Sequence, residues 1–200
     1  STSKSSRKPN ASIKHFNYDI YNPSTVSLPE SDVCIITLPF SRSLTNPSLY
    51  SSGIKQLLSK RTLNNYDKVI FTSSTSIYPN NQQFVNESSP IDTTDRALAL
   101  NDIEQYLLRY SKQAFILRLS GICGDSRYSS KSITKKQINN AQTPMNLIHI
   151  DDITNVLMSL CNHKHTTSDI LNVTCTDTPT RDAYYRYVCA QLKVPTPCFD

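Results

Sequence analysis

The sequence predicts an α/β fold with an open parallel sheet, and two observations lead to that prediction. Residues 32–38, 69–72 and 114–119 are short, nearly continuous apolar runs. Such runs are typical of parallel strands that are buried on both faces. Segments with apolar residues at helical spacing alternate with them, which is the order of β-α-β units.

Helices are predicted between these strands from apolar stripes and capping residues. In residues 50–60, Ile54, Leu57 and Leu58 share one helical face. Thr94 and Asp95 are N-cap candidates for a helix that runs to about residue 109. The apolar stripe of that second helix consists of Ala97, Leu100, Ile103, Leu107 and Leu108.

The pattern changes after residue 120. Residues 121–132 hold two of the three glycines of the chain and are predicted to form a loop with a sharp turn. Residues 146–150 and 169–174 are predicted strands, and Asp151 or Asp152 is the expected cap of the helix between them. A last helix is expected to start near Thr180.

The composition narrows the classes of function. The net charge is +5, but the basic residues are dispersed and no basic run interleaves with aromatics, so no nucleic-acid partner is expected. No apolar run reaches the length of a membrane span, and the first residues lack the apolar core of a signal peptide. The six cysteines contain no Cys-x-x-Cys pair, which fits a reducing compartment. We expect a cytoplasmic protein with a small-molecule substrate.

A cluster of hydroxyl side chains follows the second apolar run. The segment VIFTSSTSIYPNN, residues 69–81, passes from three apolar residues directly into five serines and threonines. Ligands bind at the carboxyl ends of the strands in open α/β sheets. The hydroxyl cluster therefore predicts a binding edge at this position.

Four segments resemble one family when they are taken in order. FTSSTSIYP, ILRLSGICGDSR, NLIHIDDI and ILNVTCTDTPTRDAYYRYV resemble the extended short-chain dehydrogenase/reductases, the NAD-dependent epimerase/dehydratases, in particular their small atypical YeeZ-like branch. The resemblance implies a Rossmann-like parallel sheet, N-terminally incomplete, in residues 1–120. It also implies a small C-terminal substrate lobe in residues 121–200, packed on that sheet as a single globular unit.

The activity that the resemblance implies is NAD(P)-dependent epimerase or dehydratase chemistry, an oxidoreductase function, on a small polar or nucleotide-sugar substrate. Ser74 falls where the family places the hydroxyl that binds the substrate oxygen. Thr75 would orient it, and Tyr78 is a substitute proton donor. The alternative for these three residues is structural: hydroxyls that satisfy backbone groups at a strand end, and an aromatic ring that packs against its neighbours.

The cofactor-binding residues that the resemblance implies lie at two strand ends and in the first loop. Thr37, Leu38 and Pro39 would run beside the cofactor, together with Ser73. Arg7, with Thr2, Ser3 and Lys4 in the same loop, would meet a 2′-phosphate and favour NADP over NAD. The alternative is that these first residues form a solvated basic tail.

Charged residues elsewhere give weaker predictions. Arg127 in the glycine-containing loop and Arg118 in a strand are candidate ligands for an anionic substrate group, because a guanidinium binds such groups in a bidentate manner. Arg127 is the better candidate of the two, and the alternative is an exposed arginine with no role. His149 with Asp151 and Asp152 has some character of a metal site, but its spacing better suits a strand end that caps a helix. We expect no metal.

The sequence departs from the family first in its glycines. The family has a GxxGxxG turn that holds the pyrophosphate, and Gly53, Gly121 and Gly124, the three glycines of this chain, cannot form it. The chain is therefore expected to begin just past the second strand of the family. That arrangement would leave apolar faces exposed next to the missing strand. A fragment of a longer enzyme, a different strand pairing, a homodimer and a partner that completes the sheet all remain open.

The second departure concerns catalysis. The family uses a Tyr-x-x-x-Lys pair on one helix, in which the ammonium lowers the pKa of the Tyr. This chain contains no such pair. With Glu104 aligned to the acidic residue that follows the motif, the two positions fall on Arg96 and Leu100, which cannot perform that chemistry. The alternative function is a non-catalytic binding or regulatory protein.

Overall fold

The computed structural model describes residues 16, 18–21, 28–40, 46–80, 84–124, 137–164 and 167–199. Its strands are β1 (Val33–Ile36), β2 (Lys68–Ser74), β3 (Ala114–Leu119), β4 (Gly121–Cys123), β5 (Leu147–His149) and β6 (Asp169–Val173). Its helices are α1 (Pro47–Leu57), α2 (Lys60–Leu63), the 3-10 turn η1 (Thr75–Ile77), α3 (Asp95–Tyr110), α5 (Ile150–Asn162) and α6 (Arg181–Leu192).

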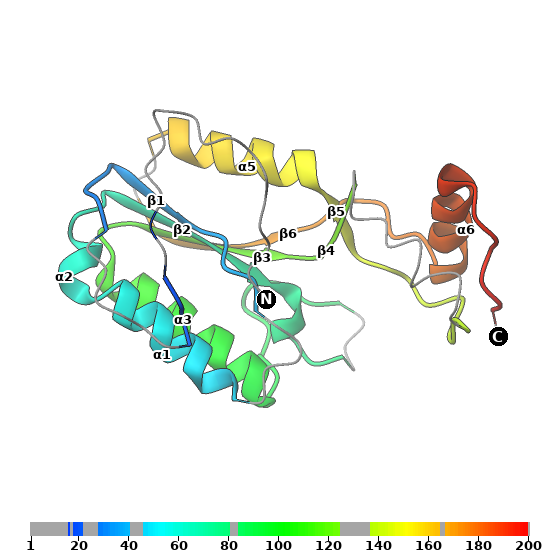
Figure 1. Ribbon diagram of the computed structural model, residues 1–200, viewed down its shortest axis with the longest axis horizontal. Helices are drawn as coiled ribbons and strands as arrows, with labels where there is room; N and C mark the ends of the chain where they lie inside the picture. The colour runs from blue at the N-terminus through cyan, green and yellow to red at the C-terminus, as the bar shows by residue number, and fades with distance from the viewer. Residues whose placement is uncertain are drawn as a thin grey trace.

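A parallel four-stranded sheet organises the fold. Its strand order is β1-β2-β3-β6, and each neighbouring pair is parallel. Helix α5 covers one face and helices α1 and α3 cover the other (Figure 1). The predicted α/β fold with a parallel sheet is confirmed. Strand β1 stands at one edge, where, in the described residues, it pairs with β2, and its Ile35 is 44% exposed.

The sheet is buried on both faces because its side chains alternate between two cores. Val69 and Phe71 of β2 belong to the core beneath α1 and α3, whereas Ile70 between them belongs to the core beneath α5. Strand β3 behaves in the same way, with Ile116 on the first side and Leu117 on the second. Successive residues of a strand point to opposite faces, so continuous apolar runs are required.

Three local predictions need correction. Helix α1 begins at Pro47, earlier than predicted, because Asn46 caps it by accepting a hydrogen bond from the Ser48 amide and because proline fits the first helical turn. His149 caps α5, rather than Asp151 or Asp152, through an imidazole nitrogen that accepts from the Asp151 amide. Residues 121–123, predicted as loop, form strand β4, which pairs in parallel with β5 in a separate two-stranded sheet.

Gly124 makes the turn that was predicted after residue 120. Its φ of +102° lies in the region that residues with a side chain rarely adopt. A Cβ atom at this position would also lie within 2.3 Å of the His149 ring. Both the backbone conformation and the close packing therefore require glycine where β4 ends.

The C-terminal elements divide between the sheet and a separate cluster. Strand β6 is part of the main sheet, whereas α6 lies at the opposite end of the molecule from α2 (Figure 1). The buried residues Val188 and Cys189 of α6 form a small core of their own. The predicted boundary between a domain of residues 1–120 and a lobe of residues 121–200 stays a prediction.

Lys68 joins the start of β2 to the end of α5, and its removal should be costly. The ammonium is buried and donates hydrogen bonds to the carbonyl oxygens of Leu160 and His163. We expect Lys68→Met to lower the free energy of unfolding in urea by about 1.5–3 kcal/mol, the range for hydrogen bonds to a charged group. Lys112→Met is the control, because Lys112 forms an exposed ion pair with Asp67, and its effect should stay under about 1 kcal/mol.

The cysteines and the helices have the following properties in the described residues. All six cysteines are free thiols, and burial raises the pKa of the Cys34 thiol to about 11, so it remains protonated at neutral pH. None of the helices in the described part of the chain combines the length and the apolar character that a membrane crossing needs.

Candidate functional site

The carboxyl ends of all four main-sheet strands meet at one edge, and polar side chains gather there. The pairing places Ser74 of β2 level with Leu119 of β3, and Leu119 level with Val173 of β6. The residues that directly follow these strands are Thr75, Ser120 and Thr174. The edge predicted from the sequence is therefore built from several strands, as expected for an open α/β sheet.

Two neighbouring cavities open at this edge. The first, which we call the strand-end cavity, has a volume of about 230 Å³ and lies where β1 and β2 end. The second, the loop cavity, has a volume of about 880 Å³ and lies beyond β2 and β3. Ser74, Ser120 and Ile122 line both cavities, so the two spaces share one wall.

The strand-end cavity contains most residues that were predicted to lie beside a cofactor. Thr37, Leu38, Pro39 and Ser73 all line it. Its wall is mixed: Phe40, Leu100, Leu119 and Ile122 give an apolar part, and several hydroxyl side chains and Arg96 give a polar part. A flat, weakly polar ring is the kind of group that such a wall accommodates.

The loop cavity is polar but almost uncharged. Hydroxyl groups come from Ser74, Thr75, Ser76 and Thr174, and amides come from Asn80, Asn146 and Asn172. Asp92 is the one charged residue among the described residues that line it. Neutral donors and acceptors of this kind match a ligand rich in hydroxyl or carbonyl groups better than a naked phosphate.

Ser74 takes part in a local cap and also faces both cavities. Its hydroxyl oxygen accepts a hydrogen bond of 3.1 Å from the Ser76 amide and so caps η1. No acceptor for the Ser74 proton occurs in the described residues, so the hydroxyl can still donate to a ligand. Thr75 instead donates to the Leu119 carbonyl at 3.3 Å. The structural and functional interpretations of Ser74 are thus compatible, whereas Thr75 has a protein partner.

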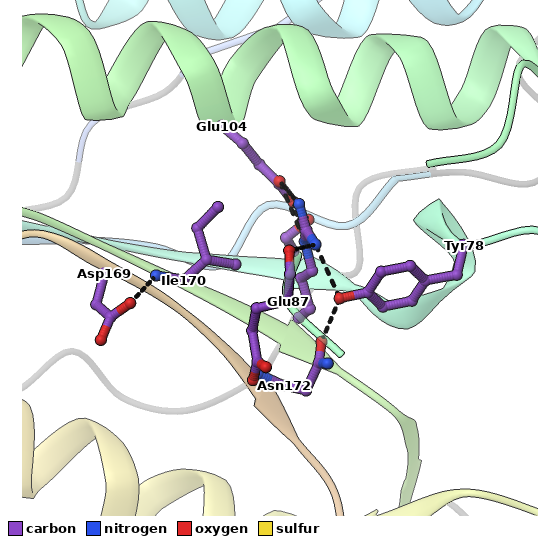
Figure 2. A network of polar contacts seen from close by, with 8 residues as sticks. Tyr78, Glu87, Glu104, Asp169, Ile170 and Asn172 are labelled. Atoms are coloured by element: carbon purple, nitrogen blue, oxygen red, sulfur yellow. Dashed lines mark hydrogen bonds and ion pairs between the residues drawn. The ribbon is translucent and has the colours of Figure 1, made fainter. Parts of the chain in front are cut away.

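Tyr78 lines the loop cavity but is held by a buried polar network. Its hydroxyl donates to the Asn172 side chain at 2.8 Å and accepts from Arg118 at 2.8 Å. Figure 2 shows the Tyr78 hydroxyl meeting the Asn172 amide, with Glu104 reaching toward them from α3. The Tyr78 hydroxyl, which was predicted to be a substitute proton donor, therefore already donates one hydrogen bond and accepts another within the protein.

The network centres on an ion pair between Arg118 and Glu104. Their side chains are 3% and 0% exposed, and the shortest contact joins the Arg118 Nη2 and Glu104 Oε2 atoms at 2.7 Å. Burial lowers the pKa of the guanidinium, but hydrogen bonds to Glu104 and Tyr78 outweigh it and raise the pKa above its usual value. Ser73 donates to the same carboxylate at 2.5 Å. Arg118 lines neither cavity, and its predicted contact with substrate stays a prediction.

Arg96 and Leu100 lie where the catalytic pair of the family was predicted to fall. Both line the strand-end cavity together with Ser74, on the first turns of α3. The Arg96 guanidinium lies 4.2 Å from the centre of the Phe40 ring, and Leu100 is 2% exposed. A cation–π contact and an apolar side chain therefore occupy these positions.

Tyr50 is the tyrosine that lines the strand-end cavity. Its hydroxyl donates to the Leu38 carbonyl at 2.6 Å. Burial, together with the nearby Tyr21, raises the pKa of Tyr50 far above its ordinary value, although Arg96 acts in the opposite direction. Tyr50 therefore keeps its proton at neutral pH and does not replace the missing catalytic pair.

Several predicted residues are not part of this site in the described structure. Arg7 and the accompanying Thr2, Ser3 and Lys4 lie outside the described residues, as does Arg127. The imidazole of His149 lies 3.5 Å from the Asp151 carboxylate. No group of three or more metal-ligating side chains occurs in the described ranges.

A third cavity, of about 580 Å³, lies between α1 and α3. The acidic residues Asp95 and Asp102 line it, and Asp102 accepts from Ser51 and is paired with Lys55. Burial raises the pKa of Asp102, but the bonds to Lys55 and Ser51 outweigh it and lower the pKa. Since this carboxylate is already neutralised, we place the candidate site at the strand ends instead.

Sequence reasoning missed two parts of the site. Ser120 is buried and borders both cavities, yet a single serine after a strand gives no signal in a sequence. The ion pair of Glu104 with Arg118 could have been predicted from the sequence. An arginine inside the apolar run AFILRL must find a buried acceptor, and a helix that packs on the same strand is the place to look for it.

The residues at this edge fit part of a dinucleotide. The strand-end cavity suits a nicotinamide ring in volume and polarity. The three glycines of the chain, Gly53, Gly121 and Gly124, do not form the turn through which backbone amides hold a pyrophosphate. A nicotinamide ring is therefore the part of the dinucleotide that the described residues fit, whereas the glycines of a pyrophosphate-binding turn are missing from the sequence.

Comparison with known proteins gives relatives in sequence and in fold. No family model matches the chain. The protein YeeZ of Escherichia coli K12 is 27% identical over 175 residues, which cover 86% of this chain and 64% of YeeZ. The chain thus spans just under two thirds of the length of this curated relative.

Two solved structures illustrate the fold. A Methylobacillus flagellatus protein assigned as an NAD-dependent epimerase/dehydratase has a TM-score of 0.70 and 20% identity, and the match covers 98% of this chain and 73% of that protein. The Bordetella bronchiseptica enzyme WbmG, in complex with NAD and UDP, has a TM-score of 0.65 and 12% identity, with coverage of 84% and 59%. The resemblance predicted from the motifs is confirmed: the chain is similar to YeeZ in sequence and to the NAD-dependent epimerase/dehydratases in fold.

Proposed function

We propose that this chain forms the substrate-facing part of an NAD(P)-dependent, epimerase/dehydratase-like oxidoreductase that acts on a small polar or nucleotide-sugar substrate. One observation carries the proposal. Ser74 lines both cavities at the carboxyl end of β2, with a hydroxyl proton that has no acceptor in the described residues. A hydroxyl held there can donate to the reacting oxygen of a substrate.

In this proposal, one cavity binds the cofactor and the other binds the substrate. The strand-end cavity would hold the nicotinamide ring against Leu38 and Pro39, and a bound nicotinamide would supply hydride transfer. The loop cavity would hold the polar part of the substrate through its hydroxyl and amide groups. NAD is favoured by the NAD complex of WbmG, and the choice between NAD and NADP belongs to the proposal.

A second candidate function is favoured by Arg96 and Leu100. These residues line the strand-end cavity at the positions predicted for the catalytic pair, so the protein would keep the ligand-binding cleft without efficient proton transfer. It would then be a non-catalytic binding or regulatory protein. Both candidates predict ligand binding, but only the first predicts turnover, so both quantities have to be measured.

Substitution of Ser74 tests the first candidate. We expect Ser74→Ala to lower kcat/KM by about tenfold or more, because it removes a donor to charge that develops on the substrate oxygen. The measurement follows the conversion of a panel of UDP-sugars by NMR in the presence of NAD, because an epimerase or dehydratase returns the hydride and leaves no net change in nicotinamide absorbance. Ser88→Ala is the matched control, since Ser88 is an exposed serine in the turn around Asn86.

Three results would separate the candidates. A rate that Ser74→Ala leaves unchanged removes Ser74 from the reaction. Saturable binding of NADH with no turnover of any UDP-sugar favours the binding protein. A folded chain that binds neither NADH nor a UDP-sugar contradicts both candidates. A urea titration of each variant shows whether a lost activity reflects unfolding, since Ser74 also caps η1.

A further inference from the structure

Ser120 carries a buried hydroxyl with no protein partner. The residue is 6% exposed, and in the described part of the chain its Oγ atom has no hydrogen-bond partner. A buried polar group without a partner is destabilising, because it has lost its hydrogen bonds to water and gained none in the protein. Such a group in a folded protein calls for an explanation, and a ligand that supplies the partner is one.

The backbone around Ser120 is fixed on two sides. The Ser120 amide donates to the Val173 carbonyl at 3.1 Å, and the next amide, that of Gly121, donates to the Asn146 carbonyl at 3.0 Å. The chain leaves the four-stranded sheet here and enters β4. The Ser120 backbone is therefore held at a defined place between β6 and Asn146, the residue that precedes β5, so that rotation about the Cα–Cβ bond alone sets the direction of the hydroxyl.

Ser120 borders a cavity, and this position is what indicates a ligand. A second hydroxyl that is buried and unpartnered within the described ranges, that of Ser111, provides the comparison. Ser111, at the end of α3, has the other buried and unpartnered side-chain oxygen in the described residues. Ser111 lines none of the three cavities, whereas Ser120 lines both cavities at the strand ends. Both serines have a buried hydroxyl without a hydrogen-bond partner in the described residues, and only Ser120 borders one of these cavities.

We propose that Ser120 is a ligand-binding residue whose hydroxyl donates a hydrogen bond to an uncharged oxygen acceptor of the bound molecule. The neutral lining of the loop cavity supports an uncharged acceptor. Water does not reach Oγ, so the side chain turns about its Cα–Cβ bond into another staggered rotamer to meet the ligand. This inference deepens the proposed function, because it names a further residue of the same site.

Two sources can provide this acceptor. One is the carboxamide oxygen of a nicotinamide in the strand-end cavity, and the other is a sugar hydroxyl in the loop cavity. The test titrates the 200-residue chain with NADH and with UDP-glucose in separate experiments. Nicotinamide alone and glucose alone are titrated as well, by ligand-observed NMR, because these fragments need no pyrophosphate cradle.

Ser120→Ala is expected to lower the affinity for one of these ligands by roughly tenfold, because one buried hydrogen bond is lost. Stability should not fall, because the substitution removes an unsatisfied group. Ser120→Cys keeps the volume but is a weak donor and should weaken binding as well. Ser111→Ala is the matched control, with unchanged binding and unchanged or higher stability. If Ser120→Ala lowers the affinity for NADH or nicotinamide, the acceptor is the carboxamide. If it lowers the affinity for UDP-glucose or glucose, the acceptor is the sugar.

The outcomes distinguish this inference from the proposed function. Unchanged affinity for every probe that binds overturns the role of Ser120 while the proposed function stands. Binding of a fragment that depends on Ser120, with no binding of NADH or UDP-glucose, supports Ser120 and contradicts the proposed function. A chain that binds none of the four probes contradicts both. A clear loss of stability in Ser120→Ala would show a structural partner and would also overturn the inference.

Discussion

Replacing Arg118 with methionine is expected to lower the free energy of unfolding by about 3–5 kcal/mol. The substitution keeps an apolar stem in β3 but leaves the Glu104 carboxylate, at 0% exposure, without its cation. An uncompensated buried charge is among the most destabilising changes that a single substitution makes. Since whole domains are stable by only about 5–15 kcal/mol, urea unfolding should show a large shift in the midpoint.

A double substitution separates the charge effect from the packing effect. Glu104→Gln alone leaves the guanidinium unpaired and should also destabilise the protein. The combination Glu104→Gln with Arg118→Met removes both charges, and the amide oxygen still accepts from Ser73. We expect the double variant to be more stable than either single variant, because neutral replacements of a buried ion pair are often tolerated. Strictly additive losses would contradict the coupling that we assign to this pair.

An exposed ion pair provides the matched control for Arg118. Arg186 and Asp182 lie one turn apart on α6, with the Arg186 side chain 60% exposed. Arg186→Met should change the free energy of unfolding by less than about 1 kcal/mol, because solvent screens such pairs. A loss in Arg186→Met as large as that in Arg118→Met would show that burial is not the reason for the effect.

The ion pair also links stability to the candidate site. Arg118 donates to the Tyr78 hydroxyl and to the Glu87 backbone carbonyl, and the Glu87 carboxylate accepts from the backbone N–H of Asn172. These contacts fix the segment after β2 against β6, next to the loop cavity. A buried pair that is costly to assemble thus holds the residues that line a binding space, and we expect Arg118→Met to weaken UDP-glucose binding as well as stability.

Local patterns predicted those elements whose signals are local. Strand β3 matches the predicted residues 114–119, because its apolar run has polar neighbours at both ends. Helix α3 starts as predicted because Thr94 caps it. The start of α1 was missed because residues 47–51 carry no apolar stripe, and the helix is begun by Asn46 and Pro47 instead. Strand β4 was missed because its pairing partner β5 lies far along the chain.

The candidate site was predictable as a location and less so as a set of contacts. The rule that ligands bind at the carboxyl ends of parallel strands led from VIFTSSTS to Ser74. The same rule says nothing about which hydroxyls already have partners. Tyr78 and Thr75 are engaged by protein groups, and Ser120 is not. That difference depends on packing between segments distant in sequence, so it becomes visible only in three dimensions.

Building the catalytic pair of the family into α3 is the second experiment with a large expected effect. Arg96 and Leu100 are one helical turn apart and line the strand-end cavity with Ser74. The double substitution Arg96→Tyr with Leu100→Lys would place a phenol and an ammonium on that wall. A positioned general acid contributes about 10²–10⁴-fold to a rate, so turnover of UDP-sugars with NAD should rise by a factor in that range.

Each single variant is a control for the pair, because the ammonium is needed to lower the pKa of the phenol. Arg96→Tyr or Leu100→Lys alone should therefore give little of the gain. The lysine carries a cost in stability, since Leu100 is 2% exposed and belongs to the core beneath α3. Leu100→Met, which keeps an apolar side chain of similar volume, shows how much of any loss comes from the charge. A double variant that stays folded and binds NADH but gains no turnover would contradict the placement of the catalytic pair on these two positions. It would favour a protein that binds its ligand at this edge without transforming it.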